Sequence, residues 1–168
     1  MKGRPPTAGA STHHHLEFPI DTPSSAPMPE YRFFQPIDVR YGDLDPQRHV
    51  NNARYFTYME QARAGYLRRL GLWDGADFDA IGIILVEASC TFRAPITFGR
   101  PVQVGVQTVR LGTKSLETAY SIRDVETKLE FATGKAVLVA YDYRRNVSIP
   151  LPESWREAIR AFEGLLDA

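Results

Sequence analysis

The sequence has one cysteine, no net charge and no long apolar run, and each shortage excludes a class of protein. A single cysteine, Cys90, rules out an intrachain disulfide framework and predicts a reducing compartment, the cytoplasm. Lys plus Arg and Asp plus Glu both number 20, and without a basic block we expect no nucleic-acid partner. No stretch approaches the roughly 20 apolar residues that span a bilayer, so no membrane partner is expected either.

What the sequence does contain is one stretch with the composition of an ordinary globular domain and, before it, an irregular segment. Of its 168 residues, 43% are hydrophobic and 24% are charged, which is typical of one soluble domain. Residues 1–29 are rich in Pro, Ser, Thr, Ala and Gly and lack periodicity, so we predict a flexible extension followed by a domain at 30–168. Three adjacent histidines, at 13–15, make a poorly defined metal site in such a tail, and no metal is predicted.

Hydrophobic spacing predicts a long helix that ends near residue 69. Asn51 or Asn52 can serve as N-cap, because a short side-chain acceptor satisfies amide groups that have no partner in the first turn. The predicted buried face has spacings of four, three, four and four and consists of Tyr55, Met59, Ala62, Tyr66 and Leu70. Two arginines and then Gly71 are the expected charge and stop signals.

The rest of the pattern predicts an antiparallel sheet. Residues 31–41 are aromatic and β-branched and include a proline, which indicates an edge strand before the helix. Twofold alternation then predicts four more strands, and a final helical pattern follows, at about residues 84–92, 102–107, 116–122, 130–144 and 153–166. Short turns between the strands imply antiparallel pairing with the long helix on one face, an α+β fold. Small residues on one face of the last strand would let that helix lie close to the sheet.

The loop before the long helix holds the residues with chemical potential. Asp45 and His49 lie within reach of the helix N-terminus, where free N–H groups and a macrodipole of roughly half a charge favour an anion or a developing oxyanion. A carboxylate that acts as base or nucleophile, beside donors for a carbonyl oxygen, suits acyl transfer or hydrolysis. The alternative is that both side chains only cap and brace the turn.

The loop and helix carry a family resemblance. The run Asp43-Leu44-Asp45-Pro46-Gln47-Arg48-His49-Val50-Asn51-Asn52, followed by Tyr55, Tyr58, Glu60, Ala62 and Arg63, resembles the hotdog-fold acyl-CoA thioesterases of the 4-hydroxybenzoyl-CoA thioesterase family. Residues 92–96, 98–99 and 137–142 resemble that family as well, so the likeness covers nearly everything after residue 30. It implies a hotdog fold, in which an antiparallel sheet wraps around a long central helix.

The resemblance also implies roles for particular residues. Asp45 would be the catalytic nucleophile or the general base for water, and His49 would orient the thioester or the water. The backbone N–H of Asn52 would polarise the thioester carbonyl, and Asn51 would hold the shape of the loop. Tyr55 matches the family pattern one turn further on, and we place it at the substrate.

Other assignments stay open at this point. Asp43 is two residues from Asp45 and can exchange roles with it, although Asp45 has the family's spacing to the histidine. Glu60 is a second candidate carboxylate on the helix, but pairing with Arg63 or another basic group is the favoured interpretation. Three basic residues are candidates for the CoA phosphates, with simple solvation as the alternative: Lys114, Arg144 and Arg145.

The sequence therefore predicts hydrolysis of an acyl-CoA to a free acid and CoA, without a metal or organic cofactor. A fatty acyl group is favoured and an aromatic one stays open. The family works as dimers or as tetramers of two dimers, so we expect a homodimer or homotetramer with the pocket between subunits. Two other functions remain as alternatives: an acyl-ACP thioesterase with the same residues, and a noncatalytic acyl-binding protein on the same fold.

Overall fold

The computed structural model describes residues 31–73 and 82–165, so the predicted extension at 1–29 and its histidines lie outside the described residues. In chain order the described elements are β1 (Phe33–Ile37), η1 (Tyr41–Asp43), α1 (Asn52–Arg69), β2 (Ile83–Phe92), β3 (Val102–Leu111), β4 (Ser115–Asp124), β5 (Glu130–Asp142), β6 (Val147–Ser148) and α2 (Glu153–Glu163). Within these ranges no helix is both long and apolar enough to cross a membrane.

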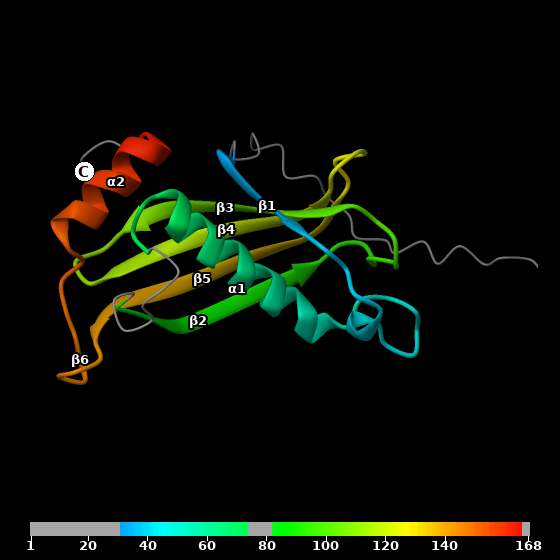
Figure 1. Cartoon of the computed structure of the whole chain (residues 1–168), viewed down its shortest axis with the longest axis horizontal. Helices are drawn as coiled ribbons and strands as arrows, with labels where there is room; N and C mark the ends of the chain where they lie inside the picture. Colours follow the sequence, from blue (N-terminus) through cyan, green and yellow to red (C-terminus); the bar gives the residue numbers. More distant parts are fainter. Residues whose placement is uncertain (1–30, 74–81, 166–168) are drawn as a thin grey trace, which may run out of the picture.

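One antiparallel sheet forms the body of the molecule, with strand order β1-β3-β4-β5-β2 and β6 paired to the end of β5. β1 and β2 are therefore the two edges (Figure 1). The predicted edge position of the first strand is confirmed, and Pro36 sits in it opposite Gln103. Proline is tolerated there because an edge strand leaves one row of backbone groups without a ladder partner.

Helix α1 lies diagonally across one face of the sheet (Figure 1). Its buried residues are Tyr55, Tyr58, Met59, Ala62, Tyr66 and Leu67. Four of the five predicted face residues are thus confirmed, but Leu70 is only half-buried at the C-cap, and Tyr58 and Leu67 are buried in addition. A helix that faces a core buries a stripe about 100° wide rather than a single row, which explains the two extra positions.

Small residues of β5 bring α1 close to the sheet, as predicted. Ala132 and Ala136 are buried beneath the helix. A Cβ at Gly134 would lie 2.7 Å from the Met59 sulfur, so only glycine leaves room for that side chain. The close approach of α1 to β5 therefore depends on the absence of a side chain at this position.

Helix α2 packs on the C-terminal half of β3. The carboxylate of Glu163 accepts hydrogen bonds from the Tyr66 hydroxyl (2.6 Å) and from the Thr108 amide (3.1 Å), which joins α2 to α1 and to the sheet. The helix ends at Gly164, whose φ of 71° is left-handed, so it stops short of the predicted residue 166.

Candidate active site

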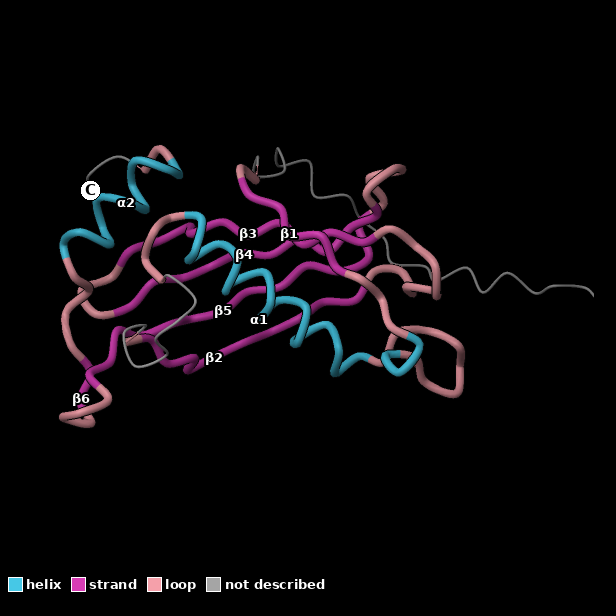
Figure 2. The backbone as a smooth tube through the Cα atoms, viewed as in Figure 1, coloured by secondary structure: helices cyan, strands magenta, loops and turns pink. Residues whose placement is uncertain are grey.

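The loop between β1 and α1 lies at one end of the sheet, while β6 lies at the other (Figure 2). Its backbone closes on itself, with the Asp45 amide bonded to the His49 carbonyl (2.8 Å) and the Arg48 amide bonded to the Asp45 carbonyl (2.9 Å). Arg48 takes a positive φ of 65° at the tip, the left-handed conformation that such a tight turn requires. The closure brings Asp45 and His49 next to each other.

A second segment, between β2 and β3, fixes the loop from the other side. The Val50 amide donates to the Ile96 carbonyl at 2.8 Å, and His49 forms an antiparallel bridge with Thr97. Ile96 is fully buried. The loop is therefore held between its own turn and a segment that lies more than forty residues further along the chain.

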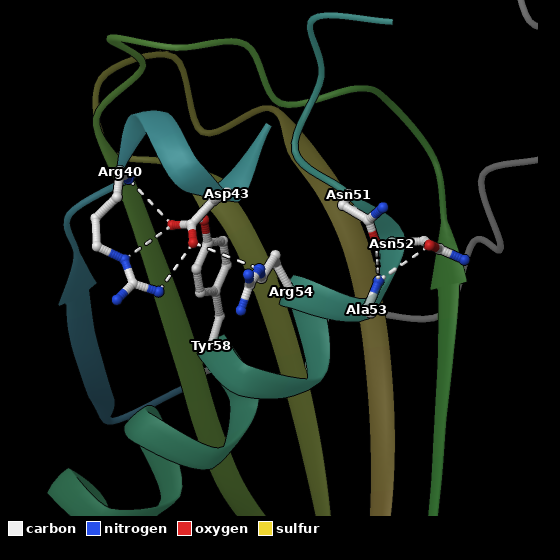
Figure 3. Close-up of polar contacts among 7 residues, drawn as sticks. All are labelled: Arg40, Asp43, Asn51, Asn52, Ala53, Arg54 and Tyr58. Atoms are coloured by element: carbon white, nitrogen blue, oxygen red, sulfur yellow. Dashed lines mark hydrogen bonds and ion pairs between the residues drawn. The ribbon is translucent and has the colours of Figure 1, made fainter. Parts of the chain in front are cut away.

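Asp43 is enclosed by the protein, although it is only two residues from Asp45. Its side chain is 1% exposed and bonds the Arg40 amide (3.0 Å), the Arg40 guanidinium (2.9 Å) and the Tyr58 hydroxyl (2.9 Å), with Arg54 at 3.6 Å (Figure 3). Burial raises the pKa of Asp43, but the hydrogen bonds from Arg40 and Tyr58 outweigh it and hold that pKa below its ordinary value. Asp43 thus stabilises the frame around the loop.

The N-terminus of α1 presents a free backbone donor. Asn51 is the N-cap, and its side-chain oxygen accepts from the Ala53 amide at 2.9 Å, as does that of Asn52 at 3.0 Å (Figure 3). The Asn51 amide is itself bonded to the Asp43 carbonyl at 2.9 Å. Within the described part of the chain, no group accepts a hydrogen bond from the Asn52 amide. This N–H is available to a ligand.

A cavity of about 360 Å³, here called the first cavity, opens beside Asn52. It is lined by Asp45, Gln47, His49, Val50, Asn52, Tyr55, Phe92, Arg93, Ala94 and Pro95. The Oδ1 atom of Asp45 accepts from the Gln47 amide (2.9 Å) and the His49 amide (3.4 Å), and no described residue donates to Oδ2. The His49 imidazole likewise makes no hydrogen bond to a described residue. Asp45 is therefore oriented by the loop with one oxygen available.

Tyr55 and Phe92 form an apolar wall of the first cavity. Their rings meet edge to face with centroids 4.9 Å apart. Burial raises the pKa of Tyr55 to about 12, so its hydroxyl stays neutral near pH 7. The wall therefore adds apolar surface without adding charge.

The structure brings four of the predicted site residues to one cavity, with Asn51 adjacent as the cap. It does not bring Lys114, Arg144 and Arg145 there within the chain. Lys114 bonds Ser148 at the opposite end of the sheet, and the amides of the two arginines bond Asp142 in the β5–β6 turn. A strand of ten residues, such as β3, spans roughly 33 Å, which is the scale of the separation.

Two further differences concern residues that the loop motif does not include. The first cavity uses residues 92–95, which sequence reasoning connected with the family but did not assign to the site. The predicted pairing of Glu60 with Arg63 is wrong. Among the described residues Glu60 forms no ion pair, and the half-buried Arg63 instead donates to the Tyr120 hydroxyl at 3.4 Å. Helical spacing allowed the pair, but Arg63 turns toward the sheet.

Comparison with known proteins agrees with this geometry. The sequence model of the thioesterase-like superfamily matches residues 39–159. The chain belongs to this superfamily. A thioesterase of Thermus thermophilus, solved with coenzyme A and Zn, is 35% identical over 83% of this chain and 99% of its own, with a TM-score of 0.71.

Two other solved structures are similar. The PA5185 protein of Pseudomonas aeruginosa strain PAO1 is 30% identical over 79% of this chain and 92% of its own, with a TM-score of 0.70. The gentisyl-coenzyme A thioesterase BH1999 is 26% identical over 76% of this chain and 98% of its own, with a TM-score of 0.66. The predicted hotdog fold and the prediction of a thioester hydrolase are thereby confirmed.

Proposed function

We propose that the chain hydrolyses acyl-CoA thioesters to a free acid and CoA in the first cavity. One observation carries this proposal: Asp45, which has an available carboxylate oxygen, and Asn52, which has an unpaired backbone amide, line the same cavity. Hydrolysis of a thioester needs both features, because the carbonyl carbon must be attacked while its oxygen gains negative charge. Asp43 is enclosed by its partners and leaves Asp45 as the loop carboxylate that a substrate can reach.

The thioester carbonyl oxygen would accept a hydrogen bond from the Asn52 amide. The positive end of the α1 dipole stabilises the oxyanion of the tetrahedral intermediate, and one such donor is worth roughly a hundredfold to a thousandfold in rate. Because the Asn51 cap fixes the first turn, this donor is oriented before the substrate binds.

Asp45 would act by one of two routes that use the same position. As general base it takes a proton from water, the water oxygen bonds to the carbonyl carbon, the C–S bond breaks, and the CoA thiolate receives that proton. As nucleophile it bonds to the carbonyl carbon, expels the thiolate, and forms an anhydride that water then hydrolyses. His49, which also lines the first cavity, would orient the thioester or the water.

Substitution of Asp45 tests the proposal. Asp45→Asn should remove nearly all thiol release from acyl-CoA substrates, because an amide can neither accept the proton from water nor form the anhydride readily. Asp38→Asn is the matched control, since Asp38 is an exposed aspartate outside the cavity. Circular dichroism and the melting temperature should be unchanged in both variants. Near-normal turnover in Asp45→Asn would contradict the assignment.

The β2 edge suggests how two copies would associate. β2 is ten residues long, and its large side chains Leu85, Val86 and Phe92 are 45%, 58% and 40% exposed. A long apolar edge favours pairing with another strand. In an antiparallel pair of two β2 strands about a twofold axis, the Ile83 end of one strand would face the Phe92 end of the other.

In this arrangement, basic residues that lie far from the first cavity of their own subunit would come close to the first cavity of the other subunit. The Tyr143 hydroxyl donates to the Ile83 carbonyl at 2.7 Å, so the turn that carries Arg144 and Arg145 lies beside the start of β2. Lys114 joins the same region through Ser148. In the dimer proposed here, Arg144 and Arg145 of the partner subunit would approach the Phe92 side of the first cavity and contact the CoA phosphates.

Complementation between variants tests the shared site. The Asp45→Asn variant and an Arg144→Ala/Arg145→Ala variant should each be impaired as homodimers. When both are co-expressed, half of the dimers are mixed and each mixed dimer has one intact composite site, so about a quarter of wild-type activity should return. Purification through two different tags isolates the mixed dimers. No recovery in that fraction would contradict a site built from two subunits.

The two alternative functions are tested by the same assay with other substrates. An acyl-ACP thioesterase would prefer acyl groups on the acidic carrier protein, although the balanced charge gives no basic platform for it. A noncatalytic acyl-binding protein would bind acyl-CoA without releasing thiol. A panel of fatty and aromatic acyl-CoA and acyl-ACP substrates separates the three functions.

A further inference from the structure

A second cavity lies between the C-terminal half of α1 and the start of β2, whereas the first cavity lies at the N-terminus of α1 and the end of β2. α1 packs most closely on β1 and β3 and crosses the sheet diagonally, so its C-terminal half diverges from the β2 edge (Figure 1). This second cavity has a volume of about 400 Å³. It is lined by Glu60, Arg63, Ala64, Leu67, Trp73, Ile83, Leu85 and Leu138. Both cavities are thus bounded by the same helix and the same edge strand, one near each end of β2.

The strand between the two cavities carries small apolar side chains toward the helix. Ala88 and Cys90 are half-buried and pack against the core cluster under α1. In the register they lie beside Ala136 and Gly134, which are also small. Burial raises the pKa of Cys90 to about 11, so its thiol is neutral near pH 7 and adds no charge to this surface. The part of β2 between the two cavities therefore presents small, uncharged side chains toward the helix.

We infer that the second cavity binds the distal part of a long fatty acyl chain whose thioester sits beside Asp45. This inference rests on the proposed function and adds the substrate class. From Asn52 to Ala64 the helix rises about 18 Å, at 1.5 Å per residue. An extended alkyl chain gains about 1.25 Å per carbon, because its C–C bonds are about 1.5 Å long and meet at tetrahedral angles. The interval therefore matches an acyl group of about 14 carbons.

The lining of the second cavity favours an alkyl end over a polar ring. Leu67 and Leu138 are buried and Ile83 is half-buried, so these three provide apolar lining. Of the two charged lining residues, Glu60 is exposed, and Arg63 donates to the Tyr120 hydroxyl of the sheet. A single-ring acyl group such as the gentisyl group would occupy only the first cavity and leave this apolar lining without a partner. A chain that fills both cavities removes their apolar surface from water, which stabilises its bound state by an amount that grows with chain length.

A chain-length series tests this inference. We expect kcat/KM to rise from hexanoyl-CoA to tetradecanoyl-CoA by at least about tenfold, since burying one methylene is worth up to about fourfold. Ala64→Phe, which fills the second cavity, should lower kcat/KM for tetradecanoyl-CoA by at least about tenfold and leave hexanoyl-CoA within about twofold. Gln61→Phe places the same ring on an exposed position that lines neither cavity and should leave the profile unchanged. Substrates are kept below their micelle-forming concentrations.

A smaller substitution at the same position keeps the test informative if the Ala64→Phe variant does not fold. Ala64→Leu fills less of the second cavity and should move the preferred length by fewer carbons. A wild-type profile that is flat or falls with chain length would overturn the inference, as would an equal loss for all lengths in both variants. A change only in sedimentation, from dimer to monomer, would show that a second copy occupies the surface instead, and would also overturn it. Complete absence of thiol release by the wild type would contradict the proposed function itself.

Discussion

Two aspartates separated by one residue have opposite environments in this chain. Asp43 points inward, where two arginines and a tyrosine surround its carboxylate. Asp45 is half-buried, and its Oδ2 has no donor among the described residues. The short η1 helix ends at Asp43, and the chain continues through Leu44 in an extended conformation, so the two carboxylates belong to different local structures. The enclosed carboxylate stabilises the fold, and the available one suits the proposed chemistry.

The stability contributed by Asp43 should depend on pH. Its pKa is lower in the folded state than in the unfolded chain, so its contribution is fully present above the unfolded pKa, about 3.9, and is lost as the pH falls through the folded value. Asp43→Asn should lower the free energy of unfolding at pH 7 by about 1.5–3 kcal/mol, the range for hydrogen bonds to charged groups. Urea unfolding at pH 7 and pH 3 should show that this difference shrinks at the lower pH.

The matched control is Asp38→Asn, which removes an exposed carboxylate from the same segment. We expect its effect on the free energy of unfolding to stay within about 0.5 kcal/mol at both pH values. An Asp43→Asn variant as stable as the wild type at pH 7 would show that the enclosed carboxylate does not stabilise the fold.

At the scale of elements, α1 has three uses along its length. Its first turn provides the Asn52 amide, its buried stripe packs on the sheet, and its side toward β2 borders both cavities. These uses are compatible because Met59 of the helix meets β5 at Gly134, while the C-terminal half of the helix diverges from β2 (Figure 1). Gly134 permits the close side of this arrangement, since any side chain there meets Met59.

Substitution of this glycine tests the close packing. Gly134→Ala should lower the free energy of unfolding by about 1–3 kcal/mol, the usual cost of overpacking a core. The loss should be smaller when Met59→Ala is present, because the Met59 side chain is the group that the new methyl meets. Gly42→Ala is the control, since a Cβ there meets nothing within 4 Å. Additive effects of the two core substitutions in denaturant unfolding would contradict this explanation.

At the scale of the whole molecule, the two sheet edges differ in what they can bind. β1 has five residues and includes Pro36, which cannot donate a backbone hydrogen bond. β2 is twice as long and carries exposed apolar side chains with no proline. Short, proline-containing edges resist pairing and long apolar edges favour it, which is why we place the proposed dimer contact at β2. The complementation and chain-length experiments together test that surface.

Local sequence features predicted the elements and part of the site. The Asn cap, the apolar spacing of α1 and the twofold alternation of the strands depend on neighbouring residues and on fixed backbone geometry, so they can be read without a structure. The position of Asp45 and Asn52 on one short loop and its helix also made their proximity predictable. The inward turn of Arg63 was not predictable, because Tyr120 on β4 determines it.

The sequence by itself determined the helix, the strands, the family and the short loop that holds Asp45 beside Asn52, because periodicity, cap residues and a contiguous motif are local features of the chain. Only the tertiary structure decided which aspartate is enclosed, which basic residues lie far from the cavity, and that a second cavity continues along α1. Those outcomes depend on segments that come together only in the folded chain. Val50 bonds Ile96, and Ala64 lines the same cavity as Leu85. No local pattern encodes such distances, because packing sets them only after folding.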